Sequence, residues 1–280
     1  MTRPADPTPP LMADRVRPLH TLPARRLAAL RGVLTDIDDT LTRDGVIEPV
    51  ALAALHRLAA AGVPVIAITG RPARWSEPAL RDWPVAAVVA ENGGVLLSRD
   101  AASPDGVRRR FAVDDAERAS RLARLLACAA AVLAALPGTV LAQDSPGRLT
   151  DIAVDHREFQ SLAAQQIDAV VAVMHSHGLT VTVSSIHING WIGEHNKWTG
   201  ARWAVETVMG CDFDASEWIY VGDSTNDQLM FQQVPLSVGV ANVARFLPAM
   251  TWPPAWVTVA ERGLGFSEVV ACLLSARSGQ

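Results

Sequence analysis

Short apolar runs alternate with amphipathic segments through the first part of the chain. Residues 32–37 predict a buried strand, and Pro49 stands where the first turn of a helix accepts proline, with leucines following at three-residue spacing on one helical face. The runs 63–69 and 86–90 predict two further strands. Strands that alternate with helices are typical of βα units. We therefore predict half of a doubly wound, mainly parallel sheet here.

The pattern changes in the middle of the chain. A long helix rich in alanine and leucine is predicted over 115–136, and two strand-like runs follow it at 139–143 and 149–155. A second helix and two further strands come next, the last at 186–192. The order helix, strand, strand therefore occurs twice, which predicts an α+β module of αββαββ pattern.

Strands alternating with helices resume after this module, at 218–221, 236–240 and 256–259. The predicted fold class is therefore α/β, with an inserted α+β domain. We expect four segments: a flexible N-terminal leader rich in proline and charge (1–27), a core in two pieces (28–110 and 193–280), and the inserted domain (111–192).

Composition excludes several functional classes. The chain of 280 residues has 25 Lys and Arg against 29 Asp and Glu, so it lacks the basic excess of a nucleic-acid binder. The longest apolar run, 125–136, is well short of the roughly 20 residues that cross a bilayer. Three widely spaced cysteines form no CxxC pair, which favours a reducing cytoplasm. We expect a small-molecule partner, with neither nucleic acid nor membrane; the oligomeric state stays open.

Carboxylates gather where two predicted strands end. Asp36, Asp38 and Asp39 follow the first strand, and Asp223 and Asp227 follow the strand 218–221. Active sites in open α/β sheets lie beyond the carboxyl ends of the strands. So many acids at one edge would repel one another unless a cation lay among them, and hard oxygen ligands favour Mg²⁺.

Groups that suit an anion occur at neighbouring positions. Thr69, Gly70 and Arg71 end the second strand with a hydroxyl, backbone amides and a guanidinium, although Arg71 could equally form a structural ion pair. Lys197 opens a predicted helix, close to its positive end. Asn92 ends the third strand, where a simple turn is the alternative role.

Two polar residues alternate on the last strand of the inserted module. His187 and Asn189 point to the same side of that strand. If that side faces the core, they are candidates for selecting the substrate; a solvated sheet face is the alternative.

These residues resemble the haloacid dehalogenase superfamily of phosphohydrolases, whose four motifs occur in order along the chain. The matching positions are Asp36-Ile37-Asp38-Asp39-Thr40-Leu41, Thr69, Lys197 and Gly222-Asp223-Ser224-Thr225-Asn226-Asp227. The separation of Asp36 from Thr69 leaves no room for an insertion, whereas the long stretch before Lys197 does. An insertion there, with a doubled helix-strand-strand pattern, resembles the type IIB cap of Cof-type and sucrose-phosphate phosphatases.

The resemblance implies a Mg²⁺-dependent phosphatase that hydrolyses a small phosphomonoester, such as a sugar phosphate, through an aspartyl-phosphate. Asp36 would be the nucleophile and Asp38 the general acid and base. The metal would be held by Asp36, Asp38 and Asp223, with Asp227 as a further ligand or an outer acid. A phosphomannomutase-like sugar phosphomutase is the alternative function.

The same resemblance implies the groups that hold the substrate. Thr69 and Lys197 would bind the transferring phosphoryl oxygens. The full set of expected substrate-binding residues is Thr69, Gly70, Arg71, Asn92, His187, Asn189, Lys197 and Asn226.

Overall fold

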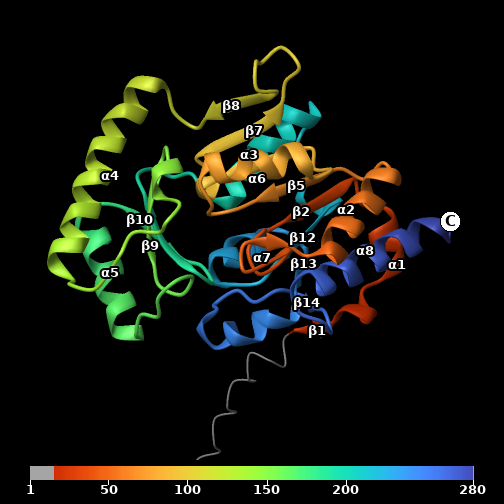
Figure 1. The fold of residues 1–280 in the computed structure, drawn as a ribbon. Helices are drawn as coiled ribbons and strands as arrows, with labels where there is room; N and C mark the ends of the chain where they lie inside the picture. The colour runs from red at the N-terminus through yellow and green to blue at the C-terminus, as the bar shows by residue number, and fades with distance from the viewer. Residues whose placement is uncertain (1–15, 280) are drawn as a thin grey trace, which may run out of the picture.

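Two large β-sheets organise the chain in the computed structural model, which describes residues 16–279, and β3 (Thr42–Arg43) and β4 (Val46–Ile47) form a separate two-stranded sheet. The larger sheet has nine strands and the smaller has three, and each packs against its own helices (Figure 1). The strands of the large sheet, in spatial order, are β1 (Arg17–Pro18), β14 (Trp256–Val257), β13 (Leu236–Gly239), β12 (Trp218–Gly222), β2 (Gly32–Thr35), β5 (Val65–Ile68), β6 (Ala87–Ala90), β7 (Val95–Arg99) and β8 (Val107–Phe111).

The large sheet is parallel from β1 to β6 and antiparallel at β7 and β8. Its strand order reverses at β2, because β5 and β6 lie on one side of β2 while β12 and β13 lie on the other. Such a reversal leaves a crevice beyond the carboxyl ends of the central strands. The predicted doubly wound, mainly parallel sheet is therefore confirmed, and the candidate residues stand at its switch point.

Helices cover both faces of the large sheet. One face carries α1 (Ala24–Ala28), α2 (Pro49–Ala60), α3 (Ala73–Asp82) and α8 (Arg262–Ser278). The other carries α6 (Lys197–Ala204), which continues into a π-helical turn, and α7 (Gln228–Gln233).

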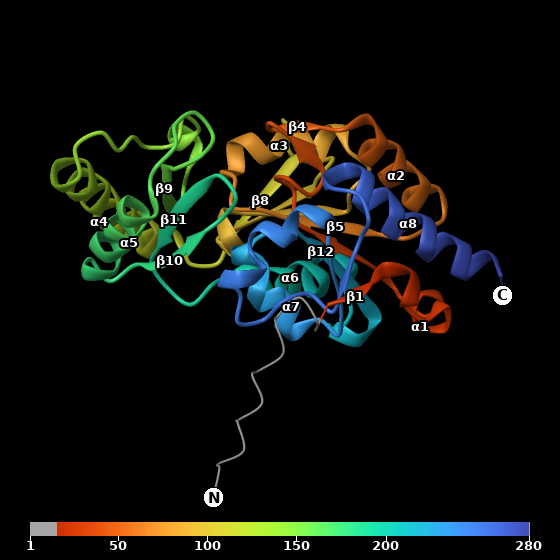
Figure 2. The ribbon, with the colours of Figure 1, turned by 90° about the horizontal axis from the view of Figure 1, so that it is seen from below.

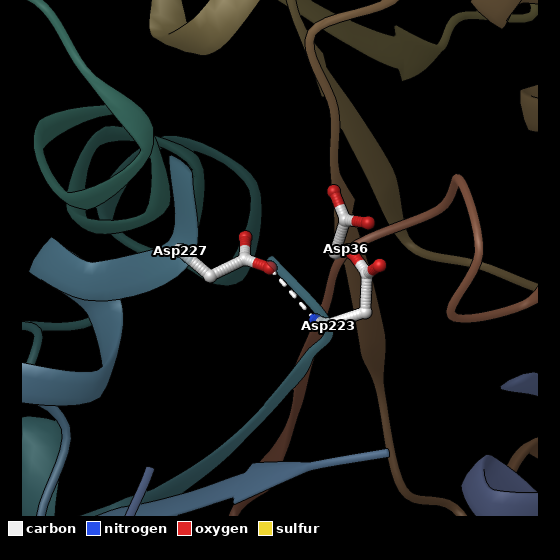
Figure 3. Close-up of side chains that lie close together, drawn as sticks. All are labelled: Asp36, Asp223 and Asp227. Atoms are coloured by element: carbon white, nitrogen blue, oxygen red, sulfur yellow. Dashed lines mark hydrogen bonds between the residues drawn. The ribbon is translucent and has the colours of Figure 1, made fainter. Parts of the chain in front are cut away.

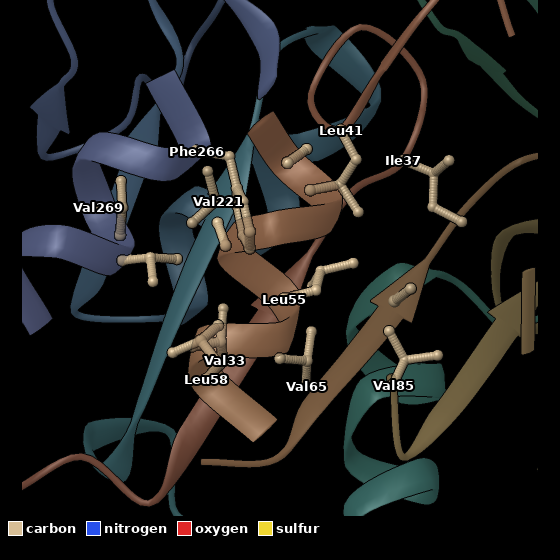
Figure 4. Packing of buried hydrophobic residues seen from close by; sticks show 14 of the residues in the cluster. Val33, Ile37, Leu41, Leu55, Leu58, Val65, Val85, Val221, Phe266 and Val269 are labelled. Carbon is tan, nitrogen blue, oxygen red and sulfur yellow. The ribbon is translucent and has the colours of Figure 1, made fainter. Parts of the chain in front are cut away.

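Successive residues of each central strand point to opposite faces of the large sheet. Val33 and Val65 point into the first apolar cluster, with Leu55 and Phe266 from the helices above them (Figure 4). Their neighbours Leu34 and Ile66 point into the second cluster. This alternation, with both faces buried, explains why the central strands read as continuous apolar runs. The rigid core thereby fixes the positions of the strand ends.

The small domain consists of α4 (Asp115–Ala135), β9 (Asp151–Asp155), α5 (Ala164–Ser176), β10 (Thr180–Val183) and β11 (His187–Trp191). Its antiparallel sheet has the order β10-β11-β9. The two helices pack on one face of this sheet, and the sheet lies between them and the large part of the molecule (Figures 1 and 2).

One predicted strand of the small domain is cut short. The segment 139–143 pairs with β9 only around the bridge between Leu141 and Val154, through the Ala142 N–H to the Ala153 carbonyl at 2.9 Å and the Asp155 N–H to the Val140 carbonyl at 3.0 Å. The backbone turns away at once, because the carbonyl of Ala142 accepts a hydrogen bond from the Ser145 amide and a 3₁₀ turn begins there. The strand predicted at 149–155 also starts later, at Asp151.

The expected N-terminal leader is wrong for its second half. β1 pairs with β14, and Arg17 stacks on the Trp256 ring at 3.9 Å. Leu19, Leu22 and Leu27 are buried in the core. Three spaced leucines among prolines and arginines gave no periodic signal, yet they bury enough apolar surface to anchor the segment. Residues 1–15 of the expected leader lie outside the described residues.

No helix within residues 16–279 is both long enough and apolar enough to cross a membrane.

Candidate active site

A buried lysine joins two carboxylates at the switch point. Lys197 is the first residue of α6, which is capped by Asn196 through a hydrogen bond from the Thr199 amide. The Lys197 Nζ lies 2.6 Å from Asp36 Oδ1 and 2.6 Å from Asp227 Oδ1, and all three side chains are at most 5% exposed. The lysine therefore ties the loop after β2 to the loop after β12.

Asp227 is saturated with hydrogen-bond donors. Its Oδ1 accepts from Lys197 Nζ and the Tyr220 hydroxyl. Its Oδ2 accepts from the backbone amides of Asp223 at 2.8 Å and Ser224 at 3.1 Å. Four donors match the roughly four acceptor sites of a carboxylate. Asp227 thus holds Lys197 and the Asp223 backbone in place.

Free carboxylate oxygens remain beside it. Asp36, Asp223 and Asp227 each offer an oxygen within 4.8 Å of the others (Figure 3). Oδ1 of Asp223 is buried without a hydrogen-bond partner among residues 16–279, and within the same residues the Asp36 carboxylate accepts a hydrogen bond only at Oδ1. Unpartnered, buried carboxylate oxygens fit a hard divalent cation such as Mg²⁺.

The electrostatics favour the same conclusion. Burial raises the pKa of Asp36 to about 8, with the charges of Asp227 and Asp38 adding to the effect and Lys197 opposing it. Burial and the nearby Asp36 and Asp227 raise the pKa of Asp223 well above its ordinary value. One lysine is therefore too little positive charge for these acids, and a cation would let them ionise at neutral pH.

Arg71 forms an ion pair with Asp38. Its Nε lies 3.0 and 3.1 Å from the two Asp38 carboxylate oxygens, and the Arg71 side chain is only 4% exposed. The Thr69 hydroxyl accepts the Arg71 backbone N–H at 2.9 Å and lies 3.5 Å from Asp38 Oδ2, a long contact that leaves its proton available to another acceptor. Of the two roles open for Arg71, the structure shows the ion pair.

The same guanidinium reaches the small domain. Arg71 lies 2.7 Å from Glu158 Oε1 and 3.3 Å from Asp144 Oδ2. Glu158 Oε2 lies 2.8 Å from His187 Nε2. Although burial opposes it, hydrogen bonds with His187 and Arg71 lower the pKa of Glu158 to about 2. Ionised Glu158 therefore bridges the two parts of the molecule.

A second group of contacts closes the small domain over the large sheet. Arg148 and Asn189 both donate to the Gly70 carbonyl, at 2.9 and 3.3 Å, and both also bond Asp151. Asn189 lies on β11 two residues after His187, so the side of β11 that carries both residues faces the core.

Gly70 lies between two amide side chains. A Cβ atom there would stand 3.3 Å from Asn189 Oδ1 and 3.3 Å from Asn92 Nδ2. Asn92 is buried in a left-handed conformation (φ 52°), and its Nδ2 has no hydrogen-bond partner among residues 16–279. The absence of a side chain at Gly70 allows this close approach.

Most predicted site residues line one narrow cleft between the two parts. The lining consists of Asp36, Asp38, Gly70, Arg71, Ser184, Ser185, Ile186, His187, Asn189, Ser224 and Asn226. Lys197 lies against Asp36, and Asn92 lies against Gly70. Asn226 accepts a hydrogen bond from the Ser224 hydroxyl at 2.9 Å. The structure therefore brings together residues from all the predicted motifs.

The cleft opens into a wider cavity of about 230 Å³. Its walls include Asp38 and Asp223 at the inner end and Arg157, Arg245 and Phe159 further out. The Phe159 side chain is 62% exposed. The cavity therefore combines carboxylates with arginines.

Glu158 and Asn242 belong to the site but were not predicted from the sequence. Glu158 lies in a loop after β9, and nothing in its neighbourhood along the chain marks it. Asn242 follows the end of β13 and donates to Asp223 Oδ2 at 3.1 Å. The strand-end rule that found the acids could have found Asn242 as well.

Comparison with known proteins identifies related sequences and folds. Residues 33–136 match the family model of haloacid dehalogenase-like hydrolases. A search of curated proteins gave no match.

Solved structures share the fold across nearly the whole chain. A Thermoplasma acidophilum protein is 18% identical, with a TM-score of 0.67 over 88% of this chain and 98% of its own. The sucrose-phosphatase of Synechocystis sp. PCC6803, solved with sucrose and phosphate, is 14% identical, with a TM-score of 0.62 over 87% of this chain and 98% of its own. The C-terminal domain of C. albicans trehalose-6-phosphate phosphatase is 15% identical, with a TM-score of 0.63 over 93% and 98%.

Proposed function

We propose that the chain is a phosphatase of the haloacid dehalogenase-like kind, that it depends on Mg²⁺ and that it hydrolyses a small sugar phosphate. One observation carries the proposal. The Asp36 carboxylate lines a polar cleft, the Lys197 ammonium lies 2.6 Å from its Oδ1, and an oxygen of Asp223 lies within 4.8 Å of one of its oxygens. This combination offers a nucleophile, a phosphate-binding cation and a place for a metal.

Asp36 and Asp223 would hold the metal, with the backbone carbonyl of Asp38 as the further ligand that the family resemblance implies. Oδ1 of Asp223, which is buried without a partner in the described part of the chain, and the shortage of positive charge around these acids support this arrangement. When bound, Mg²⁺ would neutralise charge on the phosphate oxygens.

Asp36 is the proposed nucleophile. One oxygen of its carboxylate attacks phosphorus, with Lys197 Nζ close by at 2.6 Å from Oδ1. The bond between phosphorus and the ester oxygen breaks, and an aspartyl-phosphate forms. Water then attacks the phosphorus, which regenerates the Asp36 carboxylate and releases inorganic phosphate. Lys197 balances charge on the transferring group throughout.

Asp38 is the proposed general acid and general base. It protonates the leaving alcohol oxygen in the first step and takes a proton from the attacking water in the second. Arg71 Nε contacts both carboxylate oxygens of Asp38, so the ion pair must be broken before Asp38 can reach the leaving oxygen. We propose that Arg71 turns toward the phosphate oxygens when substrate binds, which frees Asp38 to carry its proton.

A sugar is the proposed leaving group because the cleft wall from the small domain is polar. Ser185, His187 and Asn189 line the same cleft as Asp36 and Asp38 and offer hydrogen-bond donors and acceptors there. Glu158 contacts His187. Such groups suit a molecule with several hydroxyls. The sucrose-phosphatase that shares this fold was solved with sucrose and phosphate, which supports the same substrate class. In this proposal the small domain acts as a cap.

We also propose a cytoplasmic location. Cys128, Cys211 and Cys272 are all free thiols, as expected in a reducing compartment.

The test is phosphate release from a panel of sugar phosphates, with Mg²⁺ and with EDTA. Asp36→Asn should lower kcat by at least about 10³-fold, because the amide is a poor nucleophile. Asp212→Asn, the same change on the surface, should leave kcat unaltered. Full activity in Asp36→Asn would overturn the mechanism. An isomeric sugar phosphate in place of inorganic phosphate would identify a mutase.

A further inference from the structure

Asn242 occupies a junction between three segments of the site. It lies in the 3₁₀ turn η8 (Ala241–Arg245) directly beyond β13, and it is 2% exposed. Its Nδ2 donates to Asp223 Oδ2 at 3.1 Å and to the Asp39 carbonyl at 2.9 Å. Its Oδ1 accepts the Arg262 backbone N–H at 3.0 Å. Both hydrogens and the oxygen of this amide are therefore in use.

The two oxygens of Asp223 differ in their surroundings. Oδ2 accepts the hydrogen bond from Asn242, whereas Oδ1 is buried without a partner among residues 16–279. One oxygen of Asp223 lies within 4.8 Å of an oxygen of Asp36. The terminal torsion of an aspartate is broad and roughly two-fold, so it does not by itself select which oxygen faces a ligand. A donor fixed on one oxygen selects the orientation.

The donor itself is held firmly. Asn242 bonds the backbones of Asp39 and Arg262, which both adopt left-handed conformations, with φ of 55° and 52°. The Arg262 Nε also lies 2.6 Å from Asp39 Oδ1. Non-glycine residues persist in this region only where the surrounding contacts fix them, and they concentrate at functional sites. The amide therefore has little freedom to turn away from Asp223.

We propose that Asn242 is a positioning residue for the cation site: it holds Asp223 Oδ2 so that Oδ1 faces a divalent cation. This inference rests on the proposed function, which supplies the cation. The neutral amide suits this task, because a lysine or arginine at the same place would compete with the cation for Asp223. The bond to the Asp39 carbonyl also fixes the loop after β2, so one side chain sets the spacing between the two strand ends that bear Asp36 and Asp223.

The experiment measures Mg²⁺ binding directly, by calorimetry on the full chain without substrate. Asn242→Ala removes the donor, and Asn242→Leu removes it while keeping the volume, so that at least one variant folds. Both should bind Mg²⁺ about 10- to 100-fold more weakly, the usual cost of losing a partner of a metal ligand. Arg262→Gln is the matched control, because it breaks the ion pair to Asp39 but leaves the Asn242 side chain; its Mg²⁺ affinity should stay within about twofold of wild type.

Melting in EDTA provides the second readout. If the Asn242 variants lose thermal stability in EDTA yet bind Mg²⁺ as wild type does, Asn242 is a structural residue and the inference fails while the proposed function stands. Equal weakening in Arg262→Gln would also overturn it, because loop fixation would then be the cause. Wild-type protein that binds no Mg²⁺ would instead refute the metal in the proposed function, and the inference with it.

Discussion

Arg71 and Glu158 form an ion pair across the two parts of the molecule, with 2.7 Å between Nη2 and Oε1. The same guanidinium binds Asp38, the proposed general acid. The position of the small domain and the availability of Asp38 for proton transfer are therefore linked through one side chain. Opening the cleft would break the contact with Glu158 and leave Arg71 bound to Asp38. If the cleft closed around a phosphate, then Asp38, Glu158 and the phosphate would all compete for the Arg71 guanidinium.

The ion pair predicts a pH dependence of stability. The pKa of Glu158 falls from 4.5 to about 2 on folding, so its contribution is present above about pH 4.5 and is lost as the pH falls toward 2. Glu158→Gln should lower the free energy of unfolding by about 1–3 kcal/mol at pH 6 and by less at pH 3. Urea unfolding at the two pH values measures this, with Glu194→Gln as the control. An equal loss at both values would contradict the prediction.

Without Mg²⁺, the buried Asp36 carboxylate should make the free energy of unfolding depend on pH in the opposite direction. Because the pKa of Asp36 is raised to about 8 in the folded chain, the folded state is favoured below about pH 4 and loses stability as the pH rises toward 8. In EDTA we therefore expect the free energy of unfolding to fall between pH 5 and pH 8. Asp36→Asn should flatten part of that slope, and Mg²⁺ should stabilise the wild type more at pH 8 than at pH 5. A wild-type slope unchanged in Asp36→Asn would exclude Asp36 as its source.

Lys197 should matter for stability as well as for turnover. Burial would lower its pKa, but Asp227 and Asp36 outweigh that effect and raise it, so the lysine is charged. Lys197→Met leaves both carboxylates buried without their partner, which typically costs about 3–5 kcal/mol. Urea unfolding in EDTA should show this loss, and Mg²⁺ should restore part of it. Lys197→Met protein as stable as wild type in EDTA would show that the ion pairs contribute little.

The residues that the sequence revealed are those whose role follows from local position. Asp36, Thr69 and Asp223 end strands, and Lys197 begins a helix, so a parallel sheet brings them together whatever else the chain does. Glu158 escaped because its partner Arg71 is distant in sequence, and only the packing of one domain on the other joins them.

The errors in the predicted fold have a similar origin. Leu19, Leu22 and Leu27 follow no helical or strand period, and their burial depends on contacts made by α8 and β14. The segment 139–143 has the composition of a strand, but the turn at Ser145 limits its pairing with β9 to a single bridge. Local patterns therefore predicted the central strands better than they predicted the edges of the fold.

Arg157 should influence how substrate enters. It lines the outer cavity, is exposed, and has no ion-pair partner among residues 16–279, whereas Arg245 is paired with Glu261. An unpaired guanidinium at the mouth of a cleft attracts a doubly charged phosphate, and salt screens that attraction. Arg157→Gln should lower kcat/KM by about 3- to 10-fold at low ionic strength and by less at 0.5 M salt. Arg202→Gln, on the surface of α6, is the matched control. A defect in Arg157→Gln that salt leaves unchanged would point to direct contact with the sugar instead of steering.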